Sequence, residues 1–250
     1  MKSEIKMNSQ SESFDGKLLY KVSGVAALLV LFTALFEILI TFLPGGYTTS
    51  ETVVDWFRLL QDNWFLGLRN LGLLNIVMTT LGIPVSFALY IAHRRADPTF
   101  AALAIIISFF GLAVFYATNR AFPMLDLSNQ YAVAATEAER TMLAAAGRAM
   151  LSVGQSHTPG TFLAFFLSEI GGIAISVVML RGQVFSKVAA YAGLLGFGFL
   201  LIFEILSSFV SSLHSIALIP ALGGGLANMA WYILIAHRLF QLGQSPVKSI

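Results

Sequence analysis

Six apolar runs of about 20 residues dominate this sequence and restrict the chain to a fold that crosses a membrane. A helix of that length, rising about 1.5 Å per residue, spans a hydrocarbon core of about 30 Å. Hydrophobic residues make up 57% of the chain and charged residues 11%, whereas about a quarter of an ordinary soluble domain is charged. The sequence therefore predicts an all-α polytopic bundle of six transmembrane helices, at about 22–43, 70–92, 99–118, 161–180, 187–210 and 216–236.

The apolar runs divide the chain into three parts. Residues 1–21 form a polar segment rich in Ser, Lys and Glu, which we expect to be disordered at its start. Residues 22–239 hold the six-span domain, and residues 240–250 form a tail. The first run is too long for a signal-peptide core and no small-residue cleavage site follows it, so we interpret it as a retained span.

The basic residues predict the orientation. With the N-terminus inside, ten Lys and Arg residues fall on the cytoplasmic side and five fall outside, as the positive-inside rule requires. Both termini are then cytoplasmic. The inner residues are Lys2, Lys6, Lys17, Lys21, Arg94, Arg95, Arg181, Lys187, Arg238 and Lys248, and the outer ones are Arg58, Arg69, Arg120, Arg140 and Arg148.

The first long outer loop contains the pattern of an amphipathic helix. Thr48 and Glu51 have the spacing of a capping box, and Val54, Phe57 and Leu60 follow at helical intervals. Two tryptophans in the loop favour a helix lying at the membrane interface.

The second long outer loop repeats this design. Thr136 and Glu139 form another capping-box pattern, and Leu143, Gly147 and Met150 share one side of the predicted helix. We expect both short helices to cover the outer end of the bundle, and leave open whether one of them acts as a lid.

Three glutamates are the charged residues inside the predicted spans: Glu37, Glu169 and Glu204. Helical rise puts Glu37 and Glu204 about 9 Å below the outer surface and Glu169 about 12 Å below it. A charge in the hydrocarbon costs several kcal/mol, so such residues normally face the bundle interior or a water-filled cavity. We therefore predict that the three carboxyls share one acidic pocket in the outer half of the membrane.

Other polar residues reach the same predicted layer and complete the candidate pocket. Asn75 begins the second span, Asn119 and Arg120 end the third, and His214 follows the fifth. We expect Arg120 to be the counter-charge, because its long side chain can bend toward the carboxylates. The alternative is that the glutamates only tie helices together by hydrogen bonds. We also expect Asn228 to hydrogen-bond across helices, and Gly171 and Gly172 to admit a close neighbour beside Glu169.

Several classes of function are excluded or unsupported. There is no cysteine, so disulfides and thiol chemistry are excluded. A net charge of +2 without a basic stripe gives no nucleic-acid surface. None of the glutamates has the Glu-x-x-His spacing of carboxylate metal bundles, so we predict no metal or cofactor, although three carboxylates could hold a hard cation. No catalytic motif is present, and the "GQSH" segment at 154–157 is interpreted as a loop.

Two tetrapeptides occur twice. "FEIL" falls in the first and fifth predicted spans, and "IAHR" ends the second and sixth. The pairs occupy matching topological positions, so a parallel repeat of two helical hairpins is one interpretation. Coincidence among apolar residues is the other.

The segment "NRAFPMLDLSNQYAVAATEAERTMLAAAGRAML" at 119–151, with a first span near "GVAALL" and the later "LRGQVFSKVAAYAGLLG", resembles a large family of bacterial multi-span membrane proteins of unknown function. That family often has an Arg-Ser-Gly…Pro run before the fifth helix, where this chain has "RGQ" and no proline. The resemblance implies a six-span architecture in a bacterial cytoplasmic membrane, and no known activity.

From these features we expect a protein that binds or senses a small ligand, a cation or an amphiphile in the acidic pocket. One alternative is an intramembrane enzyme acting on lipid, with a glutamate as general acid or base. Another is a structural or assembly subunit of the membrane. The expected partner is the lipid bilayer, and self-association into a homo-oligomer is left open.

Overall fold

The structure, a computed structural model, describes residues 2–42 and 52–244, and all regular structure in them is helical. Six helices are long and apolar enough to cross a membrane, which confirms the predicted all-α polytopic bundle. They are α1 (Lys2–Phe42), α4 (Leu73–His93), α5 (Pro98–Thr118), α8 (Phe162–Gly182), α9 (Lys187–Phe209) and α10 (His214–Gln244).

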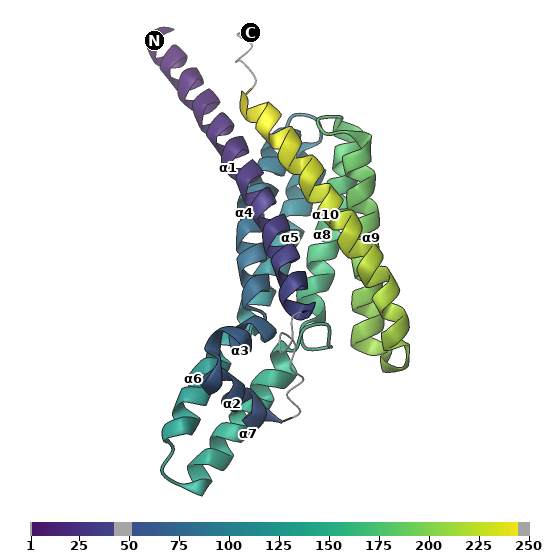
Figure 1. Cartoon of the computed structure of the whole chain (residues 1–250). Coiled ribbons are helices and arrows are strands. Elements are labelled where there is room, and N and C mark those ends of the chain that lie inside the picture. The colour runs from purple at the N-terminus through teal and green to yellow at the C-terminus, as the bar shows by residue number, and fades with distance from the viewer. Residues whose placement is uncertain (1, 43–51, 245–250) are drawn as a thin grey trace.

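The six spans form a closed ring. Helix α1 packs against α4 and α10, α8 packs against α5 and α9, and α9 also packs against α10. Helix α5 contacts α4 as well, though much less than it contacts α8. The ring order therefore follows the chain, and the first and last spans close it side by side (Figure 1).

The core of the bundle lies toward the end where α1 starts and α10 ends, which we call the terminal end (Figure 1). Its buried side chains come from the turns at that end and the helix segments beside them. They include Leu89, Ile105, Met179, Trp231 and Leu239. This half of the ring is densely packed with apolar side chains, which leaves the other half as the place where a cavity can form.

Four shorter helices form a second unit at the opposite end of the bundle, and we call this unit the helical cap (Figure 1). It consists of α2 (Val53–Asp62), α3 (Trp64–Asn70), α6 (Ala121–Val133) and α7 (Glu137–Gly154). The cap has its own apolar core, built around Phe57, Leu60 and Met124. The predicted amphipathic helices are thus present as α2 and α7, but they pack with α3 and α6 into one body.

A small residue lets α7 lie close to α2. A Cβ atom on Gly147 would come within 2.5 Å of Val53 Cγ2 and 2.7 Å of Phe57 Cζ. Ser128 of α6 donates a hydrogen bond of 2.8 Å to the Phe57 carbonyl from the other side. Phe57 and Leu60 of α2 and Leu143 and Gly147 of α7, which belong to the apolar faces predicted from the sequence, are therefore buried.

The caps of α2 and α7 show how these helices start. Thr136 accepts a hydrogen bond from the Glu139 N–H, as predicted, while the Glu139 carboxylate accepts one from the Ala135 N–H. The predicted box at Thr48 and Glu51 lies outside the described residues. Helix α2 begins at Val53, and its capping box is formed by Thr52 and Asp55.

The polar N-terminal segment differs from the expectation of disorder, because α1 is helical from Lys2 onward. Residues 2–15 contain neither Gly nor Pro and several good helix formers. Adding residues to an existing helix avoids the cost of a new nucleus, so the membrane span can extend into this segment.

The two "IAHR" segments have different surroundings. His93 is fully buried, stacks on Phe185 and makes a 2.8 Å hydrogen bond to the Leu89 carbonyl. His237 is exposed and contacts Gln241 at 2.9 Å. Nothing in this local geometry supports a shared role for the two histidines, and the repeat remains an interpretation.

Candidate functional site

All six spans line a central cavity of about 410 Å³ in the half of the bundle nearer the cap. Its wall is mostly apolar, with side chains such as Leu31, Met78, Phe115 and Leu200. A few polar side chains interrupt it, and these are Asn75, Thr79, Ser168, Glu169, Asn228 and Tyr232. A largely apolar cavity with a few convergent polar groups is the usual form of a small-molecule site.

Glu169 is the charged residue on this wall. One carboxylate oxygen, Oε2, is buried and has no hydrogen-bond partner. The residue as a whole is half-buried and lines the cavity. Buried polar groups are nearly always hydrogen-bonded, so a bare carboxylate oxygen beside a cavity calls for a partner that comes from outside the chain.

Close helix packing fixes the position of Glu169. A Cβ atom on Gly171 would lie 2.1 Å from Ser108 Oγ, and one on Gly172 would lie 2.5 Å from Phe197. The predicted close approach beside Glu169 is therefore confirmed on two sides, by α5 and by α9. Rigid backbone at this point holds the carboxylate in place and gives it little freedom to seek another donor.

The side-chain oxygen of Asn228 is a second acceptor that no hydrogen-bond donor contacts. Its Oδ1 atom is buried and unpartnered, and the residue lines the same cavity on α10. The expected hydrogen bond across helices is therefore absent at this atom. Glu169 Oε2 and Asn228 Oδ1 are thus two unpartnered acceptors on residues that line one cavity, and acceptors of this kind suit a ligand that brings N–H or O–H donors.

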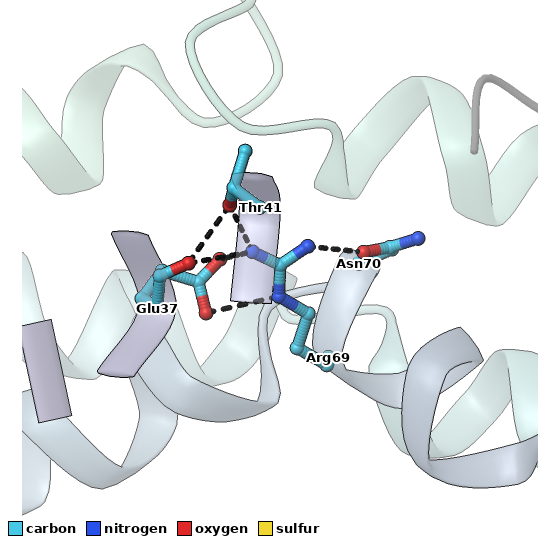
Figure 2. A network of polar contacts seen from close by, with 4 residues as sticks. All are labelled: Glu37, Thr41, Arg69 and Asn70. Carbon is cyan, nitrogen blue, oxygen red and sulfur yellow. Dashed lines mark hydrogen bonds and ion pairs between the residues drawn. The ribbon is translucent and has the colours of Figure 1, made fainter. Parts of the chain in front are cut away.

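Glu37 has a complete set of partners and stands apart from this cavity. Arg69 of α3 contacts its carboxylate through two nitrogen atoms, with Nη2 2.9 Å from Oε1 and Nε 3.2 Å from Oε2 (Figure 2). The same guanidinium also donates to the Glu37 carbonyl, to Thr41 and to Asn70. The Arg69 side chain is 2% exposed, so this pair ties the end of α1 to the corner between α3 and α4.

That corner depends on one glycine. Gly72 has φ 102°, a left-handed conformation that side chains other than glycine rarely adopt, and it turns the chain from α3 into α4. Glu37, Arg69, Gly72 and Asn75 line a small polar cavity of about 140 Å³. Asn75 also lines the central cavity, so the two spaces adjoin at this residue.

Glu204 is also paired, through a residue in the loop between α7 and α8. His157 Nδ1 lies 2.6 Å from its Oε2, and Ser208 donates a 3.1 Å hydrogen bond to its Oε1. The histidine ring is held between Phe165 and Phe203, with centroids 4.8 and 4.6 Å away. Glu204 is 1% exposed, so it acts as a buried tie between α9 and this loop.

The expected single pocket of three carboxyls is therefore corrected. Glu169 lines the central cavity, whereas Glu37 and Glu204 are held in separate polar contacts. Helical depth alone places the three carboxyls at one level. Arg69 from the corner between α3 and α4 holds Glu37, and His157 from the loop between α7 and α8 holds Glu204, so these two carboxyls have partners that Glu169 lacks.

Of the remaining predicted site residues, one lines the central cavity and two form contacts elsewhere. Asn75 lines the cavity as expected. Asn119 accepts a hydrogen bond from the Ala121 N–H and caps the start of α6. Arg120 donates to the Leu151 carbonyl and lies over the Trp56 ring, so the expected counter-charge belongs to the cap. The side chain of His214 lies outside the described residues.

Arg69 and His157 are the partners that sequence reasoning missed. Arg69 directly precedes the predicted second span, at the level of Glu37 near the end of the first. His157 lies four residues before the predicted fourth span. Both flank apolar runs on the side expected to be outside, a position that offers a cation to a carboxylate in a neighbouring span.

Over residues 2–42 and 52–244, no group of three or more His, Asp or Glu side chains is arranged to hold a metal ion. Of the three glutamates, Glu169 is the one that lines the central cavity. Comparisons with protein-family models, with curated proteins and with solved structures find no match for this chain.

Proposed function

We propose that this chain is an integral membrane protein that binds or senses a small cationic amphiphile in its central cavity, with Glu169 as the counter-charge. The observation that carries the proposal is the buried, unpartnered Oε2 atom of Glu169, a residue that lines a 410 Å³ cavity. An opposite charge supplied by a ligand would remove the cost of leaving that oxygen bare.

The two orphaned acceptors favour a protonated amine among cations. A primary ammonium group has three N–H donors and could serve Glu169 Oε2 and Asn228 Oδ1 together. An alkylamine has a pKa near that of lysine, about 10.4, and is charged at neutral pH. A quaternary ammonium ion has the charge without the donors, so it would pair with Glu169 alone.

The shape of the bundle favours binding over transport. The cavity adjoins a polar space toward the cap, but the core at the terminal end is closed by Leu89, Trp231 and Leu239. A transporter needs a second arrangement that opens this core. A sensor or binding protein needs only the arrangement described above.

The two alternatives, an intramembrane enzyme and a structural subunit, have less support from the surroundings of Glu169. An enzyme needs a nucleophile or an activated water next to the carboxylate. Two of the three cavity hydroxyls, those of Thr79 and Ser168, donate to main-chain carbonyls of their own helices, and the third is the phenol of Tyr232, a weaker nucleophile than a deprotonated serine. Glu37 and Glu204 fit the role of structural ties, but Glu169 binds no neighbouring side chain through its Oε2.

The location is part of the proposal. We place the protein in a bacterial cytoplasmic membrane with both termini inside and the cap outside. The excess of Lys and Arg on the loops and ends opposite the cap supports this orientation. The ligand would then reach the cavity from the outer side of the membrane or from its outer leaflet.

The test is the binding of hexylammonium to the purified protein in nanodiscs, corrected with empty nanodiscs. Glu169→Gln keeps the shape and removes the charge, and should weaken binding at least tenfold, about 1.4 kcal/mol. Glu137→Gln removes the same charge from an exposed position in the cap and should leave binding unchanged. Equal affinity of the parent and Glu169→Gln would reject the proposal.

A second probe separates charge from hydrogen bonding. Hexyltrimethylammonium should bind the parent more weakly than hexylammonium, because it has no donor for Asn228. Asn228→Leu should reduce this difference by weakening the hexylammonium complex alone. Tighter binding of the quaternary ion would contradict the assignment of an ammonium N–H to Asn228.

A further inference from the structure

A second cavity, of about 140 Å³, continues from the central one. It extends between α4, α5 and α8 toward the terminal end. The two share Thr79, Gly82, Ser168, Phe197 and Tyr232 on their walls, so they meet at a common boundary. The volume is close to that of an engineered apolar protein cavity of ~150 Å³ that binds benzene.

Three of the five hydroxyl groups on this wall already donate a hydrogen bond, and the other two belong to Ser86 and Tyr232. Thr79, Ser108 and Ser168 each donate a hydrogen bond of 2.7–2.9 Å to the carbonyl one turn earlier in their helix. Such back-bonded hydroxyls have no hydrogen left for a ligand. These three residues therefore add little polarity to a wall whose other members are mostly apolar.

The far end of the second cavity is closed by the apolar core. Val85, Leu89, Ile105 and Ile175 line it and are all buried. Trp231 meets Phe197 edge-on, with ring centroids 5.2 Å apart, and forms another part of the wall. Apolar atoms placed here would leave water or lipid for packed hydrocarbon, and no charged residue lines the space.

We infer that the second cavity is the tail subsite of the ligand, which is a short-chain alkyl or arylalkyl amine whose apolar end lies between α4, α5 and α8. This inference rests on the proposed function, because the ammonium head at Glu169 sets the direction of the tail. By comparison with the benzene-sized cavity, the subsite takes about six carbon atoms. Long-chain lipids exceed this space, so the ligand is a small amphiphile.

The side of the ring formed by α4 and α5 is the one on which such a ligand would enter under this inference. These two helices pack on each other only lightly, and α5 packs mainly on α8. Ile83 on α4 and Phe109 on α5 line the second cavity, and each is 36% exposed. These two side chains therefore do not seal the cavity as the buried residues at its far end do.

The test measures affinity along the series from butylammonium to decylammonium, at known free aqueous concentrations in nanodiscs. Each methylene that enters the subsite should tighten binding about fourfold, until the space is full and the gain stops. The affinity of the longest members should then be flat or fall. Affinity that does not depend on chain length would overturn the inference.

Two glycines provide a matched pair of variants. A Cβ atom at Gly82 would meet no atom within 4 Å, and the residue lies where the two cavities join. Gly198 on α9 also has open space within 4 Å, and lines neither cavity. Gly82→Leu should remove the dependence on chain length while butylammonium still binds, and Gly198→Leu should behave as the parent.

Ser86→Leu guards against a general effect of Gly82→Leu on the central cavity. Ser86 lines the second cavity and not the first, so leucine there fills the subsite alone. Loss of the chain-length dependence in both variants supports the inference, and its persistence in both overturns it. If the dependence on chain length persists in both variants while Glu169→Gln still weakens the binding of hexylammonium, the tail subsite is wrong and the proposed function stands. If Glu169→Gln has no effect, both are wrong.

Discussion

Glu37 and Glu169 are the same residue type on two spans of one bundle, and their surroundings are opposite. Glu37 accepts two contacts from Arg69, at 2.9 and 3.2 Å, in a network that also contains Thr41 and Asn70. Glu169 lies on the wall of a cavity with one buried oxygen that nothing contacts. Depth in the bundle does not distinguish them, but the supply of donors does.

The presence or absence of a hydrogen-bond donor within the chain distinguishes a structural carboxyl from a candidate functional one in this bundle. Glu37, and Glu204 with its histidine and serine, satisfy the carboxylate within the chain, so the fold depends on the charge. Glu169 has one buried oxygen that nothing contacts, so the fold keeps an unsatisfied polar atom at a cost. A residue kept at a cost to stability is where a ligand is expected to act.

The largest effect is expected for Arg69→Ala. This change leaves the Glu37 carboxylate without its partner, and should lower the free energy of unfolding by about 3 kcal/mol. That is the lower end for a broken buried pair, because Glu37 itself is 34% exposed. Reversible unfolding in mixed micelles would measure it.

Arg58 provides the matched control for this prediction. It pairs with Asp55 at 3.9 Å, and its side chain is 70% exposed. Arg58→Ala should change the free energy of unfolding by less than about 1 kcal/mol. Equal losses of unfolding free energy in Arg69→Ala and Arg58→Ala would show that the buried pair contributes no more to stability than the exposed one.

Glu204→Gln should give the next largest loss, about 1–3 kcal/mol, because an amide cannot accept in place of both carboxylate oxygens. Ser208→Ala removes one of the two contacts and should cost about 1 kcal/mol. The same unfolding measurement applies. A stable Glu204→Gln variant would place Glu204 with Glu169 as a charge the fold does not need.

Glu169→Gln is expected to act in the opposite direction. Removing a charge that has no partner should leave the free energy of unfolding unchanged or raise it by up to about 1 kcal/mol. This outcome, beside the losses at Arg69 and Glu204, would separate the two kinds of glutamate. A loss as large as that of Glu204→Gln would show that Glu169 is a structural tie after all.

The smallest effect concerns Asp55, an exposed carboxylate whose partners lie in its own helix cap. Hydrogen bonds from Thr52 lower the pKa of Asp55 below its ordinary value of 3.8. The charged form is thus favoured in the folded state, so its contribution is present above the unfolded pKa and is lost as the pH falls through the folded one. Asp55→Asn should show a small loss in melting temperature at neutral pH, and none in strong acid. A loss that persists in acid would exclude the charge as its cause.

The apolar runs were sufficient to predict the architecture, because hydrocarbon thickness imposes one length on every span. All six runs correspond to helices long enough to cross a membrane. The amphipathic patterns around Phe57 and Leu143 also predicted which side chains are buried. They could not show that α2 and α7 would pack with α3 and α6, since periodicity gives a face to bury and does not name its partner.

The site was predictable only in part. Counting along helices found the three glutamates, but rotation about the helix axis and the course of the loops decide what each one meets. Arg69 and His157 come from a corner and a loop that have no periodic signal, so their pairing with Glu37 and Glu204 depends on tertiary packing. Arg120 was expected at the carboxylates because it can reach far, yet Trp56 and the Leu151 carbonyl hold it in the cap.

The most direct measurement is the distance between the nitrogen of bound hexylammonium and the side-chain carboxylate carbon of Glu169, by solid-state NMR with isotope labels on both. Binding as a counter-charge predicts a separation within about 6 Å, which disappears in Glu169→Gln. A nitrogen found next to Glu37 or Glu204, or near no carboxylate, would contradict the account.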